Sequence, residues 1–385
     1  FINPVENRLV SFFAIGEGWH NYHHTFPWDY KAAEFGRINL SLTIINLFAK
    51  IGWAYDLKTV SKEMIEKRVT RTGDGSHEIW GWGDKDQTKE NYESADCFVD
   101  LRAKGCRGCA GTAASRDPTV LTSRGPFRCG SHRLGLLVRP REKQPLPSLP
   151  TGPLNECDDI VTDKIPQDTY EPDDRPIDIV WRNVVVFVIL HSVALYGLYL
   201  CFISAMWTTT IYGILLYQMS AFGITGGAHR LWAHRSYKAK WPLKVILLIC
   251  QTLAHQNSVI EWSRDHRVHH KFQETDADPH NAKRGFFFSH MGWLLCKKHQ
   301  EVKNKGKGVD MSDLYAEPLL RLQHKYFLVL MPIVCFVLPT IIPMLLWNET
   351  FMNAYCVNIL RYICALHATW LVNSAAHMWG SKPYD

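Results

Sequence analysis

Long apolar runs without charged residues dominate the second half of the chain. The first run extends from Asn183 to Ala228, 46 residues without a single Asp, Glu, Lys or Arg. A helix needs about 20 apolar residues to cross a bilayer, so this run is long enough for two crossings. We expect them near 184–203 and 207–228, joined by a tight turn.

A second apolar run predicts two more crossings, near 326–347 and 354–376. The third crossing contains prolines, which membrane helices tolerate where neighbouring groups satisfy the freed backbone. The fourth carries an arginine and a histidine and is the least apolar of the set. Two shorter stretches, at 245–253 and 286–295, have about half the length of a crossing, so we interpret them as interfacial or packed helices.

The segment between the second and third crossings sets the orientation. With four crossings, this segment and the chain outside the outermost crossings lie on one side of the membrane. Lysine-rich loops face the cytosol. The segment holds five closely spaced lysines: Lys297, Lys298, Lys303, Lys305 and Lys307. The pattern therefore predicts an all-α membrane protein with four transmembrane helices, a cytosolic helical cap and both termini cytosolic.

Composition divides the chain into three parts. Residues 1–95 are polar and aromatic-rich and contain no crossing, whereas 157–385 hold all the long apolar runs. Residues 96–156 are rich in Gly, Pro, Ser and Arg and have no helical or strand period, which predicts a disordered linker. The net charge of +6 suits anionic lipid or a phosphorylated substrate and does not indicate nucleic acid.

A zinc site in the linker is an alternative that the cysteine spacing raises. Four residues follow the pattern C-x2-C-x19-C-x2-H: Cys106, Cys109, Cys129 and His132. Such spacing is typical of zinc sites in small folded modules. The low complexity of the surrounding sequence argues against a folded module here.

The histidines cluster in a way that predicts a metal site. Two blocks have the form HxxHH (HNYHH and HRVHH), a pair in HRLWAH follows the second crossing, and one histidine follows the fourth. Residues i, i+3 and i+4 share one face of a helix, so each HxxHH block can aim three imidazoles at one place. The clustered histidines are His20, His23, His24, His229, His234, His266, His269, His270 and His377.

Nine imidazoles are too many for one ion, because a metal takes four to six ligands, so two ions are indicated. Zinc has no redox chemistry and would support hydrolysis only beside a carboxylate base. Iron fits better if a membrane site holds an unactivated chain. We interpret the remaining histidines as ordinary surface or core residues: His77, His132, His191, His255, His280, His290, His299, His324 and His367.

Four stretches carry a family resemblance. They read NPVENRLVSFFAIGEGWHNYHHTFPWDY, GAHRLWAHRSYKA, EWSRDHRVHHKFQETDADPHNAKRGFFFSHMGWLL and NSAAHMWGSKPYD. The sequence resembles the membrane fatty acyl-CoA desaturases of the stearoyl-CoA Δ9 type, in an insect-like form. The resemblance covers roughly residues 1–95 and 157–385, which is all of the chain except the linker.

The resemblance implies an oxidoreductase of the endoplasmic reticulum membrane with its catalytic face in the cytosol. Such an enzyme uses two iron ions (Fe²⁺), O₂ and electrons from cytochrome b5 and its NADH-dependent reductase. It removes two hydrogens from adjacent methylenes of a fatty acyl-CoA, giving a cis double bond, here expected at Δ9, and water.

The resemblance also implies which residues hold each iron. One ion would be held by His229, His234, His270 and His24, with Asn373 holding a water. The other would be held by His266, His269, His377, His20 and His23.

Substrate residues carry over from the resemblance in three groups. Trp262, Gln256 and Thr369 match positions that bend the acyl chain at the reacting carbons. Tyr217 and Ala221 match the end of the acyl tunnel. The basic side chains expected near the CoA phosphates are Arg267, Lys298 and Lys303; a solvated face or a lipid headgroup contact is the alternative for these three.

The order of the segments departs from the family. HNYHH comes last in the family but first here, and the end GSKPYD reads straight on into FINPVE, so the chain is a circular permutation. In this interpretation 1–95 is the C-terminal part of a desaturase and 157–385 is its membrane core. A fusion of tandem genes and a true permuted chain are the competing explanations.

Two other functions remain as alternatives. A related histidine-rich membrane oxygenase, either a hydroxylase or a sphingolipid desaturase, would share the metal site. An inactive permuted remnant would share the sequence motifs without the activity.

Overall fold

The computed structural model describes residues 4–35, 39–81 and 177–384, which form one compact unit. The predicted linker 96–156 and the cysteine-rich pattern within it lie outside the described residues. In the described part almost all regular structure is helical; the strands β1 (Ala54–Tyr55) and β2 (Lys238–Ala239) form one short antiparallel pair. The prediction of an all-α fold is confirmed.

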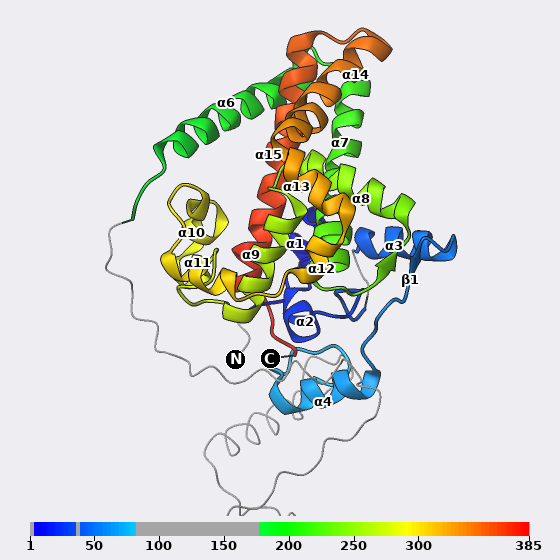
Figure 1. The fold of residues 1–385 in the computed structure, drawn as a ribbon, viewed down its shortest axis with the longest axis vertical. Helices are drawn as coiled ribbons and strands as arrows, with labels where there is room; N and C mark the ends of the chain where they lie inside the picture. The colour runs from blue at the N-terminus through cyan, green and yellow to red at the C-terminus, as the bar shows by residue number, and fades with distance from the viewer. Residues whose placement is uncertain (1–3, 36–38, 82–176, 385) are drawn as a thin grey trace, which may run out of the picture. The chain divides into compact units, whose positions relative to one another are not determined.

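Three helical segments are long and apolar enough to cross a membrane. They are α6 (Trp181–Ile203), the continuous segment α13–η4–α14 (Pro318–Met331, Pro332–Val337, Leu338–Trp347) and the segment α15–α16 (Phe351–Asn373, Ala375–Met378). α15 is the most buried of the three and packs against both α6 and α7 (Figure 1). These three segments coincide with the first, third and fourth predicted crossings.

The second predicted crossing, 207–228, lies on α7 (Trp207–Phe222) and the start of the π-helix η1 (Gly223–Ala233). α7 has 16 residues, so by length it is not among the three spans. A fourth span is counted only if α8 (Trp241–Ala254) and α9 (Val259–Phe272), which meet at 80°, are one broken span. The number of crossings predicted from the sequence therefore stays a prediction.

The bend between α8 and α9 has a local cause. His255 and Asn257 adopt left-handed backbone conformations, with φ of 47° and 65°, which ends α8. Ser258 then caps α9 and Glu261 completes the capping box by bonding back to Ser258. A cap of this kind stabilises a helix start by roughly 1 kcal/mol.

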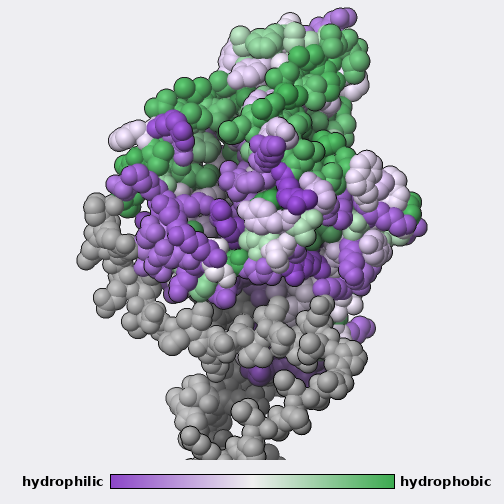
Figure 2. Space-filling view, in the orientation of Figure 1, coloured by the Kyte–Doolittle hydropathy of each residue, from purple (hydrophilic) through white to green (hydrophobic). Residues whose placement is uncertain are grey.

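Short helices from residues 8–72 and 282–316 build the rest of the unit. From the first segment come α1 (Arg8–Phe13), α2 (His20–Thr25), α3 (Leu40–Lys50) and α4 (Lys62–Thr72). From the second segment come η2 (Ala282–Arg284), α10 (Phe286–His290), η3 (Gly292–Leu294), α11 (Gln300–Lys307) and α12 (Ser312–Ala316). Figure 2 shows polar residues gathered over this region and apolar residues over α7 and α14.

Backbone contacts join the first described residues to the last ones. Val5 N donates to the Ala376 carbonyl at 2.7 Å, and Glu6 N donates to the Ser381 carbonyl at 2.7 Å. Tyr384 N donates to the side-chain oxygen of Asn21 at 2.9 Å. The first described residues and the last ones thus pack together. The permuted order and the domain boundaries stay predictions.

Candidate metal centre

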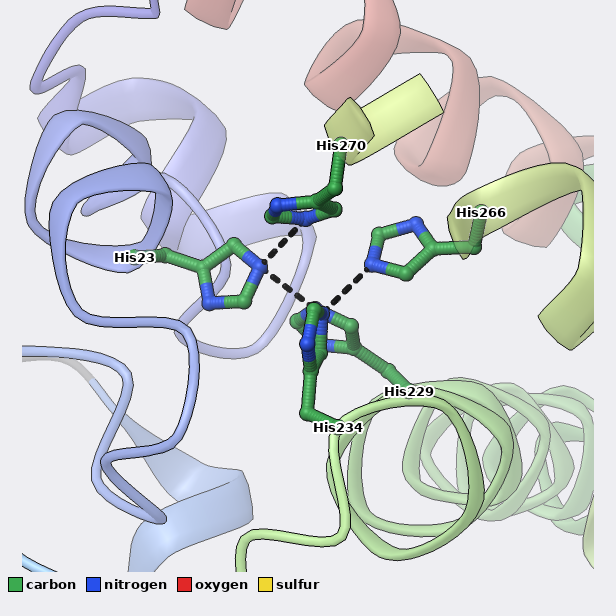
Figure 3. Close-up of side chains that lie close together, drawn as sticks. All are labelled: His23, His229, His234, His266 and His270. Carbon is green, nitrogen blue, oxygen red and sulfur yellow. Dashed lines mark hydrogen bonds between the residues drawn. The ribbon is translucent and has the colours of Figure 1, made fainter. Parts of the chain in front are cut away.

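Five imidazoles from three segments converge on one point (Figure 3). His23 comes from α2, His229 and His234 come from η1 and its C-cap, and His266 and His270 come from α9. Their ligand nitrogens all lie within 4.8 Å of one another. The Nε2 of His23 lies 2.9 Å from that of His229 and 3.0 Å from that of His270, and the Nε2 atoms of His234 and His266 are 2.8 Å apart. We call these five residues the five-histidine cluster.

Four more imidazoles make a second group next to the first. His20 and His24 come from α2, His269 from α9 and His377 from α16. The Nε2 of His20 lies 3.1 Å from the Nε2 atoms of both His24 and His377. We call this group the four-histidine cluster. The nine clustered histidines named from the sequence are therefore the members of these two clusters.

Each HxxHH block is divided between the two clusters, and helix geometry explains the division. Residues i and i+4 lie one above the other on a helix, whereas adjacent residues differ by about 100°. His266 and His270 accordingly share the five-histidine cluster, whereas His269 points into the four-histidine cluster. On α2 the roles are reversed, because His20 and His24 share the four-histidine cluster.

The π-helix η1 explains why His229 and His234 converge although they are five residues apart. In an α-helix such a pair points to different sides. The π-helix closes i→i+5 hydrogen bonds, and the bond from His234 N to the His229 carbonyl, at 3.0 Å, is one of them. Their rings lie 4.9 Å apart as a result. Nothing in the spacing alone predicted the π-helix.

Two buried carboxylates contact the Nδ1 atoms of clustered imidazoles. Glu17 lies 2.9 Å from Nδ1 of His229, and Asp278 lies 2.9 Å from Nδ1 of His269. A carboxylate at Nδ1 keeps the ring proton there and leaves the Nε2 lone pair free for a metal. Neither Glu17 nor Asp278 could be recognised from the sequence as a partner of these histidines, because a lone acidic residue gives no signal of what it contacts.

Electrostatics favour neutral rings and charged carboxylates. Burial, followed by the neighbouring imidazoles, lowers the pKa well below its usual value for six clustered histidines: His20, His23, His24, His234, His266 and His270. Burial acts to raise the pKa of Glu17, but Arg230 and His229 outweigh it and lower that pKa to about 2. Neutral imidazole is the form that binds metal.

The arrangement fits two metal ions. Ligand nitrogens at right angles around an ion, each about 2.1 Å away, lie about 3.0 Å from one another, which is the Nε2 separation found here. An all-imidazole donor set suits iron, zinc or copper. The geometry therefore supports a paired metal site without selecting the element.

Comparisons with known proteins give the family. The chain is 67% identical over 208 residues to the acyl-CoA Delta-9 desaturase of Acheta domesticus, covering 54% of this chain and 58% of that protein. It is 60% identical over 210 residues to the Acyl-CoA Delta12-desaturase of the same species, covering 59% of that protein. It is 49% identical over 263 residues to stearoyl-CoA desaturase 2 of Mus musculus, covering 67% of this chain and 68% of that protein.

The chain belongs to the membrane fatty acyl-CoA desaturase family. The matches to the two Acheta domesticus desaturases span less than two thirds of those proteins. No family model matches the chain.

The structure divides the histidines of this desaturase-family chain differently from the two ligand sets that the resemblance implies. His23 and His266 lie in the five-histidine cluster with His229, whereas His24 lies in the four-histidine cluster. The i, i+4 pairing on α2 and α9 is the physical reason. Asn373 lines the adjacent cavity, and its role in holding a water stays a prediction.

A largely apolar cavity lies against both clusters. His20, His229, His266 and His269 form part of its wall. An apolar lining with a few polar groups is typical of small-molecule sites. Three residues named from the desaturase resemblance line it: Trp262, Thr369 and Ala221.

The other two residues named for the acyl chain lie outside the cavity wall. Gln256 donates from Nε2 to Thr369 Oγ1 at 2.9 Å and accepts from Trp262 Nε1 at 3.3 Å, so it supports the wall from behind. The Tyr217 hydroxyl donates to the Phe13 carbonyl. Tyr217 therefore ties α7 to α1 instead of facing the cavity.

The three basic residues named for CoA have different surroundings. The Arg267 guanidinium donates to Asp313 and to three backbone carbonyls, which leaves no N–H for a phosphate. The prediction for Arg267 therefore finds no support. Lys298 pairs with Asp265 and is one third exposed, and Lys303 is exposed on α11. The CoA role of the two lysines stays a prediction.

Among the residues that the structure describes, His280 is the one histidine interpreted from the sequence as ordinary that lies in a potential metal group. His280, Asp278 and His269 bring their ligand atoms within 4.8 Å of one another. Because His269 already directs Nε2 into the four-histidine cluster, this trio is better described as an outer layer around that cluster. Its sequence signal is the D-x-H spacing of Asp278 and His280.

Proposed function

We propose that this chain is an acyl-CoA desaturase that introduces a cis double bond, at Δ9, into a saturated fatty acyl chain. One observation carries the proposal: members of both imidazole clusters line a largely apolar cavity whose wall also includes residues of α7, α9 and α15. A hydrolase would place a polar carbonyl group at its metal. Here most of the wall beside the imidazoles consists of Ala, Ile, Val and Trp side chains, and its one carboxylate, Glu17, is bonded to His229 and Arg230.

The five-histidine and four-histidine clusters would each hold one iron ion. Iron, when bound, supplies the redox chemistry with dioxygen that zinc cannot supply. The overall reaction removes one hydrogen from each of two adjacent methylenes. Together with O₂, two electrons and two protons, it yields the alkene and two water molecules.

The chain's own residues prepare the site for this reaction. Glu17 and Asp278 keep a proton on Nδ1 of His229 and His269, so that both Nε2 lone pairs face inward. Trp262 and Thr369 would shape the acyl chain where it passes the clusters. The apolar lining excludes water, which protects a reactive centre from side reactions.

The partners follow from the same proposal. Fatty acyl-CoA and O₂ would be the substrates, and cytochrome b5 with its NADH-dependent reductase would supply the electrons. The exposed lysines of α11 support an anionic group near the cap, because Lys binds phosphate by charge-assisted hydrogen bonds. Multi-pass insertion in the endoplasmic reticulum membrane, with the cap in the cytosol, is part of the proposal.

Expression in a yeast strain that lacks its own Δ9 desaturase tests the proposal. We expect growth without added oleate and a cis-Δ9 acyl product in the lipids, measured by gas chromatography with mass spectrometry. A His266→Ala and His269→Ala double variant is the matched control and should give no product. Hydroxylated acyl chains would indicate a related oxygenase, unsaturated long-chain bases a sphingolipid desaturase, and absence of both product and bound iron an inactive remnant.

A further inference from the structure

A buried arginine in the membrane-spanning helix α15 contacts the carbonyl groups of two helix breaks. Arg361 is 3% exposed. Its Nη1 donates to the Leu253 carbonyl at 3.0 Å, and its Nη2 donates to the Cys335 carbonyl at 2.9 Å. An ionisable side chain inside a membrane segment is costly to bury, and its position is normally explained by a function or a specific partner.

Both carbonyls are left without an ordinary helical partner. Leu253 is in the last turn of α8, where the helix ends and its carbonyls have no N–H to accept from. The α-helical partner of the Cys335 carbonyl would be the N–H of Pro339, which proline lacks. A fixed cation at such carbonyls also complements the negative end of a helix dipole.

The remaining N–H groups of Arg361 are occupied as well. Asn358, one turn earlier on α15, accepts from Nη2 at 2.6 Å and from Nε at 3.2 Å. Ser220 on α7 accepts from Nη1 at 3.2 Å. The guanidinium therefore joins α7, α8, η4 and α15 at one point, a geometry that its planar fork permits and an ammonium group does not.

The clamp made by Arg361 lies next to the bend that carries Gln256. Gln256 is bonded to Thr369 of α15 and to Trp262 of α9, and these two residues line the cavity. α15 thus holds the 253–256 segment at two points, Arg361 and Thr369, about 12 Å apart along the helix. Without the contact from Arg361 to Leu253, the 253–256 segment can shift along α15, and the contact between Gln256 and Thr369 can shift with it.

We propose that Arg361 is a positioning residue that sets which acyl carbons lie beside the histidine clusters, and therefore where the double bond forms. This inference rests on the proposed desaturase activity. Arg361 itself does not line the cavity and contacts no clustered histidine. Its effect is transmitted through the 253–256 segment.

Product analysis of Arg361→Lys and Arg361→Met tests the inference. We expect both variants to make positional isomers shifted from the wild-type position. The ratio of major to minor isomer should fall roughly ten-fold in Arg361→Met, which corresponds to about 1.4 kcal/mol of lost discrimination. Arg361→Lys should be intermediate, because it keeps the charge but not the fork. Bound metal per chain should not change.

The matched control is Asn353→Ala on the same helix. Asn353 is buried and bonds to the Ser204 carbonyl and Glu349, two turns before Arg361. The control should lower stability without moving the double bond. An unchanged isomer ratio in both Arg361 variants would overturn the inference, whereas absence of product from the wild-type chain would overturn the proposed function instead.

Hydrogen exchange covers the case in which the Arg361 variants make no product. If Arg361 clamps the bend, amide exchange in Arg361→Lys should rise at 253–258 while exchange along α9 stays as in the wild type. Exchange that is unchanged at 253–258, or raised equally throughout the membrane helices, would overturn the clamp.

Discussion

His23 and His24 are adjacent in the chain, yet their imidazoles belong to different clusters. The Nε2 of His23 lies 2.9 Å from that of His229, whereas the Nε2 of His24 lies 3.1 Å from that of His20. A single turn of α2 therefore supplies both clusters. This arrangement couples the two proposed metal positions through one short helix.

The division of His23 and His24 predicts separable metal losses. His23→Ala removes one of five ligands in its cluster, and His24→Ala removes one of four in the other. We expect each variant to lose metal from its own cluster only, because the other cluster keeps all of its ligands. His24→Ala should therefore retain about one metal ion per chain where the parent holds about two. Metal analysis of the purified protein by mass spectrometry measures this.

The two histidine variants also differ in expected severity. His24→Ala leaves three imidazoles and should lose its ion more completely than His23→Ala, which leaves four. His299→Ala, a histidine outside both clusters, is the control and should keep the parent metal content. Equal loss of both ions from both cluster variants would contradict two separate positions.

Asp278 provides a prediction about the outer layer of the site. Asp278→Asn keeps the shape but replaces the carboxylate that holds the proton on His269 Nδ1. Loss of such a partner typically lowers metal affinity by about 10- to 100-fold. Competition titration with a chromogenic chelator measures the change. The nearby Asp276→Asn, at a part-exposed position outside the metal groups, should have no effect, and equal behaviour of the two variants would argue against the role of Asp278.

The sequence predicted the histidine clusters well because imidazole spacing on a helix maps directly onto faces. It did not predict the split of each HxxHH block, since residues i, i+3 and i+4 share one broad helix face and the spacing alone does not show that the pair i, i+4 joins one cluster and residue i+3 the other. The π-helix between His229 and His234 was equally hidden, because an i→i+5 step has no compositional mark. Glu17 and Asp278 could not be recognised either. Their contacts with His229 and His269 become visible only in the folded chain.

Membrane topology shows where hydropathy alone is insufficient. The charge-free run 183–228 was divided into two crossings, but α7 stops at Phe222 and the chain continues as the π-helix that carries the metal-site histidines. The apolar stretch at 245–253 is shorter than a membrane crossing by itself. In the structure it is part of α8, which meets α9 at an angle of 80°. The length of an apolar run indicates how many residues are buried in lipid or protein. It does not indicate where a helix ends or changes to a π-helix.

Ala221 gives a prediction about substrate length. It lines the cavity on α7, and a larger side chain there would occupy space that an acyl chain needs. We expect Ala221→Leu to reduce the use of an 18-carbon relative to a 14-carbon acyl chain by roughly 10-fold, as a few methylenes of lost contact would. Product profiles from mixed acyl-CoA substrates measure the ratio. Met219→Leu, at a position 43% exposed on the same helix, is the control, and the same profile from both variants would show that Ala221 does not limit chain length.

The lowered pKa values of the clustered histidines predict acid sensitivity of the metal-free protein. Six of them are neutral in the folded chain at pH values where an unfolded histidine, with a pKa of about 6.5, already binds a proton. Above about pH 6.5 neither state is protonated, so stability is independent of these groups. As the pH falls below 6.5 towards the lowered pKa values, each such histidine costs up to about 1.4 kcal/mol per pH unit.

Thermal unfolding of detergent-solubilised protein between pH 8 and 5 measures this effect. The melting temperature of the metal-free chain should be nearly constant down to about pH 6.5 and then fall steeply, since only the unfolded state takes up the protons. Added Fe²⁺ or Mn²⁺ should raise the melting temperature at pH 5.5 as well as at pH 7, because the folded imidazoles are neutral at both pH values and keep their Nε2 lone pairs for the metal. A melting temperature that stays level through pH 6 in the absence of metal would mean that the imidazoles are solvated and not held together as the two clusters require.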